Sequence, residues 1–160
     1  MNVKDVAVAT VFAAMYVGLC LGLAPISYEA IQVRVADALY PLIGLFGWPA
    51  FYGLLVGHFI ANIFSPLGVI DLLSVVMFLP AKLAILKWKL KAVPLHVLSV
   101  ALWVAYMLHY LFGLPYWLTA LYVGIGESIA EIGLGFPLFY AIKKRMIKKC
   151  VAKSKCQSSH

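Results

Sequence analysis

Charge is what this sequence has least of. Only 12% of its 160 residues are charged, and six acidic residues stand against thirteen basic ones. Hydrophobic residues make up 64% of the chain, and its mean hydropathy is +0.98. These values lie outside the range of soluble globular domains and inside that of membrane proteins. Because the chain is short, we expect one integral membrane domain.

Motifs for several kinds of chemistry are also missing. The three cysteines form no CxxC pair or disulfide framework. No GxxxxGK[ST] sequence is present, so the chain does not hydrolyse ATP through a P-loop. No group of His, Cys, Asp or Glu has a metal-ligand spacing, so no metal or cofactor is expected. The apolar runs are helix-length, about 20 residues, and do not alternate as barrel strands do.

The fold class predicted from these runs is all-α: an integral membrane bundle of six transmembrane helices, over residues 1–149. Residues 150–160 are expected to form a short basic and polar cytoplasmic tail. One apolar run, residues 38–46, is too short to cross a bilayer upright, so it is expected either to run on from the polar stretch before it or to be a broken helix that lines a cavity. The other expected spans are residues 6–23, 49–64, 72–85 with a bend near Pro80, 94–112, and 116 to the basic tail at Lys143.

The net charge of +7 is explained by membrane topology rather than by nucleic-acid binding. Twelve of the thirteen basic residues lie near the N-terminus, between Lys82 and Lys91, or from Lys143 onward. With six spans, these three places lie on one side of the membrane. They are therefore expected to be cytoplasmic, in the plasma membrane, with both termini inside. Arg34 alone lies on the outer side.

One polar stretch interrupts the apolar pattern. Residues 24–39 place Glu29, Gln32, Arg34 and Asp37 between two apolar runs. Polar groups next to hydrocarbon are costly unless they are paired or face water, so they are candidates for function. We interpret the stretch as a loop folded over the mouth of a cavity. A local salt bridge between Arg34 and Asp37 is the structural alternative.

Two carboxylates lie in the last expected span. Glu127 and Glu131 are four residues apart and therefore share one helix face. Two buried carboxylates repel each other, so they suit a ligand that brings a cation or N–H donors. The alternative is an internal pair with Arg34 or with a histidine. Among the histidines, His96 lies at the cytoplasmic start of its span and is assigned no role.

The other candidates are weaker on their own. His58 and Asn62 are four residues apart on one face, a spacing that also suits a hydrogen bond between helices. Asp71 begins a helix, where its charge favours the positive end of the helix dipole. Ala9 and Ala13 give the first span a small face that lets another helix approach closely, although such spacing is common by chance.

Several short motifs occur together in this chain and share a pattern. They are APIS at 24–27, IQVRV at 31–35, AL at 38–39, NIFSPLG at 62–68 followed by Asp71, GE at 126–127 and LGFPL at 134–138. In these motifs the chain resembles the QueT family, the queuosine-precursor S components of energy-coupling factor (ECF) transporters. The similarity covers about residues 5–142. It departs from the family pattern at Val33, Asp37 and Glu131.

The resemblance implies a six-helix ECF S component that captures its ligand outside the cell. It also implies docking on a transmembrane T component that is driven by two cytosolic ATPases. Ala9 and Ala13 match the small face of the first helix that such proteins present to the T component. The implied ligand is a 7-deazaguanine, such as the 7-cyano or 7-aminomethyl compound or queuine.

The implied binding roles follow from the ligand's chemistry. A carboxylate can accept the N–H donors along the pyrimidine edge of a deazaguanine, and we assign this role to Glu127. Glu131 would meet a cationic substituent. The remaining lining and the loop gate are assigned to two groups: Asn62, Asp71, Arg34 and Gln32 in the lining, and Ser27, Tyr28, Glu29 and Asp37 in the gate.

Three alternatives stay open at this point. The chain could be an S component for another small molecule, such as a vitamin or an amino acid. His58 and Asn62 fit the HxxxN element of a membrane-embedded glutamate-type protease, but the adjacent glutamates of that class are absent. A purely structural membrane protein would not explain polar residues gathered at one mouth. We therefore expect a transporter component and no enzyme activity.

Overall fold

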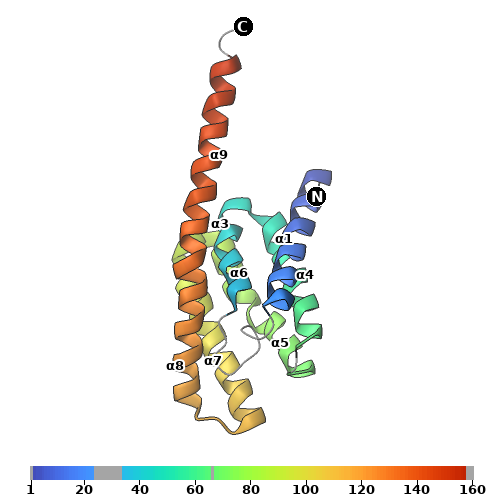
Figure 1. The fold of residues 1–160 in the computed structure, drawn as a ribbon, viewed down its shortest axis with the longest axis vertical. Coiled ribbons are helices and arrows are strands. Elements are labelled where there is room, and N and C mark those ends of the chain that lie inside the picture. The colour runs from blue at the N-terminus through green and yellow to red at the C-terminus, as the bar shows by residue number, and fades with distance from the viewer. Residues whose placement is uncertain (1, 24–33, 66, 158–160) are drawn as a thin grey trace.

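The computed structural model of this chain describes residues 2–23, 34–65 and 67–157, with side chains described as far as residue 148. All regular structure in these residues is helical, as the sequence predicts. The helices form an elongated bundle, and the first helix begins at the end toward which the last one runs (Figure 1). The elements that build the bundle follow the predicted runs closely.

The first half of the bundle consists of two long helices and a short central one. Helix α1 begins with a capping box in which the backbone N–H of Asn2 donates to Asp5 at 3.0 Å. The central segment is a 3₁₀ helix that begins inside the polar stretch and is followed by one α-turn, so the short apolar run continues from that stretch, which is one of the two alternatives expected for it. The bounds are α1 Val3–Gly22, η1 Val35–Leu42, α3 Ile43–Phe46 and α4 Trp48–Ile63.

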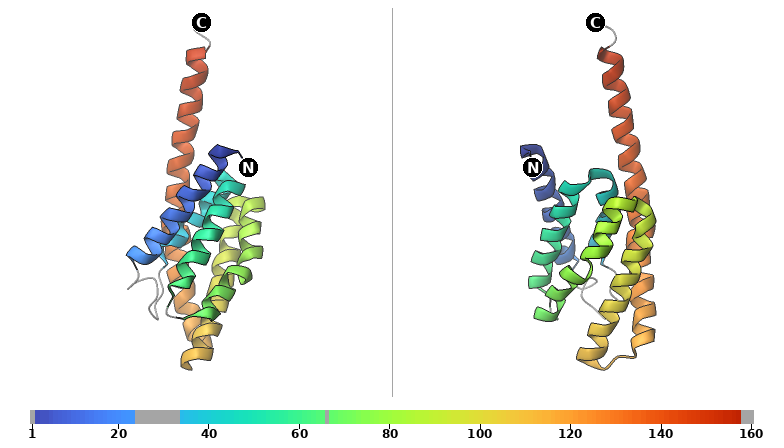
Figure 2. Two further views of the ribbon diagram at one scale, coloured as in Figure 1. Left: turned by 90° about the vertical axis from the view of Figure 1, so that its right-hand side faces the viewer. Right: turned by 180° about the vertical axis from the view of Figure 1, so that it is seen from behind.

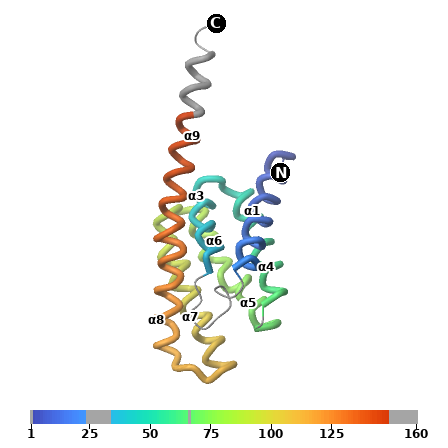
Figure 3. The backbone as a smooth tube through the Cα atoms, viewed as in Figure 1, coloured from blue at the N-terminus to red at the C-terminus, as the bar shows by residue number. Residues whose placement is uncertain are grey.

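The second half begins with a bent helix pair. The helix is interrupted at Phe78, between α5 and α6. Pro80 lies in the first turn of α6, so the predicted bend near Pro80 is confirmed. The last three elements run without interruption and form one continuous rod (Figure 3). The bounds are α5 Val69–Met77, α6 Leu79–Trp88, η2 Lys89–Ala92, α7 Val93–Phe112, α8 Tyr116–Ser128, η3 Ile129–Leu134 and α9 Gly135–Gln157.

Glycines with positive φ mark three of the breaks between helices. Gly47 ends α3 at φ 69°, Gly68 precedes α5 at φ 67°, and Gly113 ends α7 at φ 68°. Glycine adopts this left-handed region without the steric cost that a Cβ would bring. The glycines that punctuate the sequence therefore terminate helices where the sequence predicts turns.

Three described stretches are long and apolar enough to cross a membrane: Val3–Gly22, Val69–Phe112 and Tyr116–Lys148. The second of them contains the break at Phe78 and the tight turn η2. A shorter apolar helix covers Val35–Phe46. The chain is thus an all-helical protein with membrane-spanning character, and its last helix extends beyond the rest of the bundle (Figure 2).

Helices α1 and α4 approach each other through small residues. A Cβ on Gly53 would lie 2.3 Å from the carbonyl oxygen of Ala9, and one on Gly57 would lie 3.0 Å from that of Ala13. Only glycine fits at these two positions without moving the helices apart. Part of the small face of α1, at Ala9 and Ala13, therefore packs against α4 of the same chain.

The substitution Gly53→Ala is expected to destabilise the bundle by roughly 1–3 kcal/mol, because the new methyl group collides with the backbone of α1. Thermal unfolding in detergent would measure this loss. The matched control is Gly18→Ala, where an added Cβ meets nothing within 4 Å and alanine favours the helix. Equal melting temperatures for the two variants would show that the α1–α4 contact is looser than described.

Candidate functional site

In the part of the chain that the structure describes, ten polar or charged side chains that are more than nine-tenths buried come together in the bundle. We call them the buried polar cluster. They come from η1 and the residue before it, from α4, α5, α6 and α7, and from the α8–η3 rod. The ten are Arg34, Asp37, His58, Asn62, Asp71, Ser74, Lys82, His96, Glu127 and Glu131. Burying this many polar groups is costly unless they are paired or serve a ligand.

One half of the cluster, which we call the basic half, is centred on His58. Its Nε2 lies 3.2 Å from Nη1 of Arg34 and 3.1 Å from Nδ2 of Asn62, while Nζ of Lys82 lies 2.6 Å from its Nδ1. Arg34 also pairs with Asp71, with 3.5 Å between Nη2 and Oδ2. The His58 imidazole therefore links Arg34, which precedes η1, to α4 and α6, and Arg34 extends this link to α5.

Asp71 is held from two further sides. The amide of Asn62 donates to its backbone oxygen at 2.8 Å, and Ser74 donates to its Oδ1 at 3.0 Å. The indole of Trp103 in turn donates to Ser74 at 2.9 Å. The predicted place of Asp71 in the first turn of a helix is confirmed. These bonds also have a structural role, because the backbone oxygen of Asp71 ties α5 to α4 and Ser74 ties α5 to α7.

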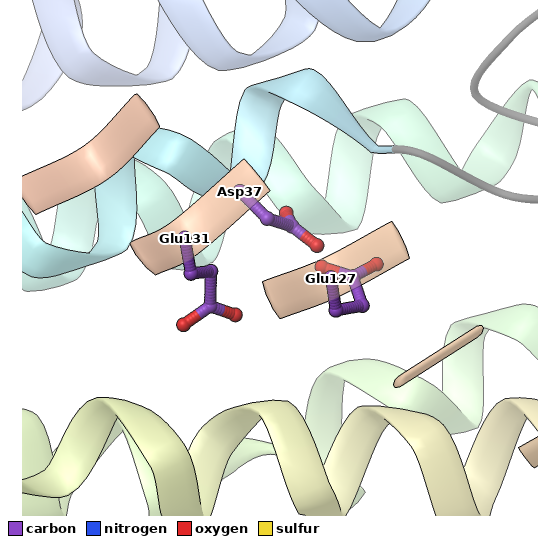
Figure 4. A group of neighbouring side chains, drawn as sticks. All are labelled: Asp37, Glu127 and Glu131. Carbon is purple, nitrogen blue, oxygen red and sulfur yellow. The ribbon is translucent and has the colours of Figure 1, made fainter. Parts of the chain in front are cut away.

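The other half, which we call the acidic half, contains three carboxylates. Asp37, Glu127 and Glu131 each have an oxygen within 4.8 Å of an oxygen of the other two. Figure 4 shows the carboxylates of Asp37 and Glu127 turned toward each other, with Glu131 beside them. Tyr16 donates to Oδ1 of Asp37 at 2.6 Å. Carboxylates this close repel one another, so the acidic half favours a group that brings N–H donors or positive charge.

Glu131 has a partner of its own on α7. Its Oε1 lies 2.6 Å from Nδ1 of His96, and both side chains are fully buried. Glu131 lies in η3, a single π-helical turn between α8 and α9. Such turns change the direction in which side chains project and are frequent at functional sites. Here the π-turn begins two residues after Glu127, and both glutamates lie close to Asp37 of η1.

Within the described residues, five buried side-chain atoms of the cluster have no hydrogen-bond partner, and one of them, Asp71 Oδ2, has only its 3.5 Å ion pair with Arg34. Four are oxygens, which accept hydrogen bonds, and the fifth is an imidazole nitrogen. They are Asn62 Oδ1, Asp71 Oδ2, Glu127 Oε2, Glu131 Oε2 and His96 Nε2. Buried polar atoms are normally satisfied, so a concentration of unsatisfied acceptors indicates a missing donor. The geometry suits a ligand that is rich in N–H groups. The three carboxylates of the acidic half do not by themselves indicate a metal ion.

Half of the twelve residues to which sequence analysis assigned a role lie in this cluster. Six of them come together here: Arg34, Asp37, Asn62, Asp71, Glu127 and Glu131. Ser27, Tyr28, Glu29 and Gln32 lie outside the described residues. Ala9 and Ala13 lie on α1, away from the cluster, and line an apolar groove with Val56 and Thr10.

The sequence interpretation needs three corrections. Lys82 does not lie in the basic cytoplasmic loop, because α6 continues through it and turns it into the core. His96 is not a residue without a role, because it pairs with Glu131. Arg34 forms its ion pair with Asp71 rather than with Asp37, because η1 directs Asp37 to Tyr16. The expected alternative of a histidine partner for Glu131 is confirmed.

Residues that carried no sequence signal complete the site. Tyr16 and Tyr40 are fully buried and joined by a hydroxyl contact of 3.3 Å. Tyrosine is common in membrane helices, especially near the interfaces, so composition does not distinguish these two. The polar environment that gives them their role is formed by residues distant in sequence.

A family model described as QueT transporter matches residues 6–144 of this chain. The match covers most of the sequence and every residue of the buried polar cluster. The chain belongs to the QueT transporter family. No curated protein and no solved structure matches it. The resemblance found in the sequence motifs is thereby confirmed.

Membership in the QueT family decides between the classes of function. It is a transporter family rather than an enzyme family, so the alternative of a glutamate-type protease is wrong. His58 and Asn62, which suggested that protease, contact each other within the buried polar cluster instead. The site of this QueT-family protein is accordingly interpreted as a binding site.

Proposed function

We propose that this QueT-family protein is the substrate-binding S component of an ECF importer and that it captures a 7-deazaguanine. The observation that supports the proposal is the group of unpartnered acceptor oxygens in the buried polar cluster. Glu127, Glu131 and Asn62 face inward from different elements, and each has an oxygen that can accept a hydrogen bond from a ligand. A guanine-like ring carries several N–H donors on one edge and therefore matches that need.

Glu127 is the residue proposed to recognise the ring edge. Its carboxylate is buried, and its Oε2 has no partner. A carboxylate accepts two parallel N–H bonds from neighbouring ring and exocyclic nitrogens, which gives both strength and orientation. Asn62, whose Oδ1 has no hydrogen-bond partner among the described residues, supplies a further acceptor, and the Asp71 carboxylate, which pairs with Arg34, supplies another.

Glu131 and His96 are proposed to meet the substituent on the 7-position. Glu131 has one oxygen on His96 and one without a partner. An aminomethyl group would bring a positive charge and donors to this free oxygen. The proposed substrate is therefore a deazaguanine with a basic side group. Gln32 and the loop gate of Ser27, Tyr28, Glu29 and Asp37 are proposed to close over the ligand.

The proposed orientation follows the charge pattern. We propose six passes through the plasma membrane, with both termini in the cytoplasm. The exposed basic residues Lys4, Lys87, Lys89 and Lys143 would then lie on the cytoplasmic side, in accord with the positive-inside rule. The membrane domain is proposed to cover residues 1–149, with the tail 150–160 in the cytoplasm.

The groove between α1 and α4 is proposed to receive the transmembrane T component, which acts with two cytosolic ATPases. Ala9, Thr10, Ala13 and Val56 line this groove, and Val56 is half-exposed. Small residues let a partner helix come close in a membrane. The substitution Thr10→Trp would fill the groove and is expected to abolish co-purification with the T component. Unchanged co-purification would contradict the assignment.

The first test of the function is thermal unfolding of the purified protein in detergent. The panel contains 7-cyano- and 7-aminomethyl-7-deazaguanine, queuine, guanine, and a set of vitamins and amino acids. Ligand at a hundredfold above its dissociation constant should add about 2.7 kcal/mol of stability. Stabilisation by deazaguanines alone supports the proposal. Stabilisation by a vitamin or an amino acid would keep the transporter and replace its substrate.

A further inference from the structure

Lys82 occupies an unusual position for a lysine in a membrane protein. It is fully buried in the first turns of α6, and its Nζ lies 2.6 Å from Nδ1 of His58 and 4.7 Å from the centre of the Tyr40 ring. The family assignment and the proposed binding roles give it no function. Lysine is almost never fully buried without an ionic partner, so the burial of Lys82 beside a histidine needs a physical reason.

The hydrogen bonds of His58 determine whether the neighbouring Lys82 amine is charged or neutral. Arg34 Nη1 is always a donor, and it points at Nε2 of His58. The Asn62 amide is oriented by its bond to the backbone oxygen of Asp71, so its Nδ2 also donates toward Nε2. Nε2 is therefore the acceptor nitrogen of a neutral imidazole. The proton of that imidazole lies on Nδ1 and points at Lys82, so the lone pair of the Lys82 amine accepts the hydrogen bond.

The surroundings of Lys82 support the same conclusion. Within the described residues, a basic and an acidic side chain come within 4.0 Å of each other only in Arg34 with Asp71 and His96 with Glu131, so no described carboxylate lies within 4.0 Å of Nζ. A fully buried ammonium group without an anion beside it is strongly disfavoured. The titratable and charged groups around Lys82 are Arg34, Asp37, Tyr40, His58, His96 and Glu131.

We propose that Lys82 is a positioning residue that stays uncharged in the binding site, accepts a hydrogen bond from the Nδ1–H of His58, and so leaves the acidic half free for the positive charge of a ligand. This proposal rests on the proposed function, since it concerns the same site. A charged lysine here would compensate Asp37 and Glu131 and would repel a cationic ligand. An uncharged one holds His58 in place without competing.

Nitrogen NMR of the ligand-free protein tests the charge state directly. Protein labelled with ¹⁵N at the lysine Nζ is compared with the variants Lys82→Met and Lys87→Met. Lys87 lies on the same helix but is exposed, which makes it the matched control. The expected result is one resonance of the neutral-amine type that disappears only in Lys82→Met. If the resonance lost in that variant is of the ammonium type, the proposal is overturned.

Binding constants test the effect on specificity. The neutral 7-cyano and the cationic 7-aminomethyl deazaguanine are titrated against the wild type, Lys82→Met and Lys82→Arg. The preference for the cationic compound should change by less than about threefold in Lys82→Met, because no charge is removed. It should fall about tenfold or more in Lys82→Arg, which brings a permanent charge.

Each outcome separates the two proposals. If Lys82→Met raises the preference for the cationic compound tenfold, the lysine was charged and the inference is wrong. If Lys82→Met loses both compounds while remaining folded, the amine contacts the ligand instead, which also overturns the inference. If the wild type binds no deazaguanine at all, the proposed substrate fails, and the NMR result still decides the charge of Lys82.

Discussion

Replacing Glu127 with glutamine is expected to weaken binding of the deazaguanine by roughly 30-fold to several thousandfold, because removing one partner of a buried, charge-assisted hydrogen-bond pair costs about 2–5 kcal/mol. Glutamine keeps the size of the side chain but turns one of its two acceptors into a donor. That donor would face the N–H groups of the ligand. Calorimetry in detergent with the wild type as reference measures the loss directly.

Two comparisons give this experiment its meaning. Ser128, the next residue, donates to the backbone oxygen of Gly124 and does not belong to the cluster, so Ser128→Ala is the matched control and should bind normally. Glu131→Gln should weaken the aminomethyl compound more than the cyano compound, because only the former brings a charge to Glu131. Full affinity in Glu127→Gln would remove Glu127 from the binding role.

The sequence predicted the helices well because their ends are set by local chemistry. Gly47 and Gly113 adopt positive φ where a chain with a Cβ would be strained, and Pro80 lies in the first turn of α6 where its missing N–H costs nothing. These effects act within a few residues of the sequence. They therefore remain visible without any knowledge of the three-dimensional fold.

The candidate site was predictable only in part. Glu127, Glu131 and Arg34 stand out because a charge in an apolar run is rare. Lys82 did not stand out, because it precedes Lys87, Lys89 and Lys91 and looks like the start of their loop. Whether such a lysine lies in an exposed loop or is buried in the core depends on how α6 packs against the other helices.

Which side chains pair within the cluster is also not predictable from their separation in the sequence. Asp37 is three residues from Arg34, yet Arg34 pairs with Asp71, which lies on α5. The short 3₁₀ helix η1 places Asp37 beside Tyr16 and the two glutamates instead. His96 likewise finds Glu131 across the bundle. These pairings follow from tertiary packing, which a single sequence does not encode in any local pattern.

The pair of Arg34 and Asp71 leads to the largest expected effect on stability. Arg34→Met should destabilise the ligand-free protein by about 3–5 kcal/mol, because it leaves the buried Asp71 carboxylate without its cation. For a chain of this size, that corresponds to a fall of about 6–20 °C in melting temperature. The control Arg145→Met removes an exposed arginine on α9 and should change the melting temperature very little.

The double variant Arg34→Met/Asp71→Asn distinguishes a buried ion pair from simple loss of packing. Removing both charges of a buried pair costs much less than removing one, so the double variant should regain most of the stability lost in Arg34→Met. Asparagine can still accept the hydrogen bond from Ser74 that Asp71 accepts. If the double variant is as unstable as the single one, Arg34 stabilises the bundle through its other contacts. The charge of Asp71 would then be free to serve the ligand alone.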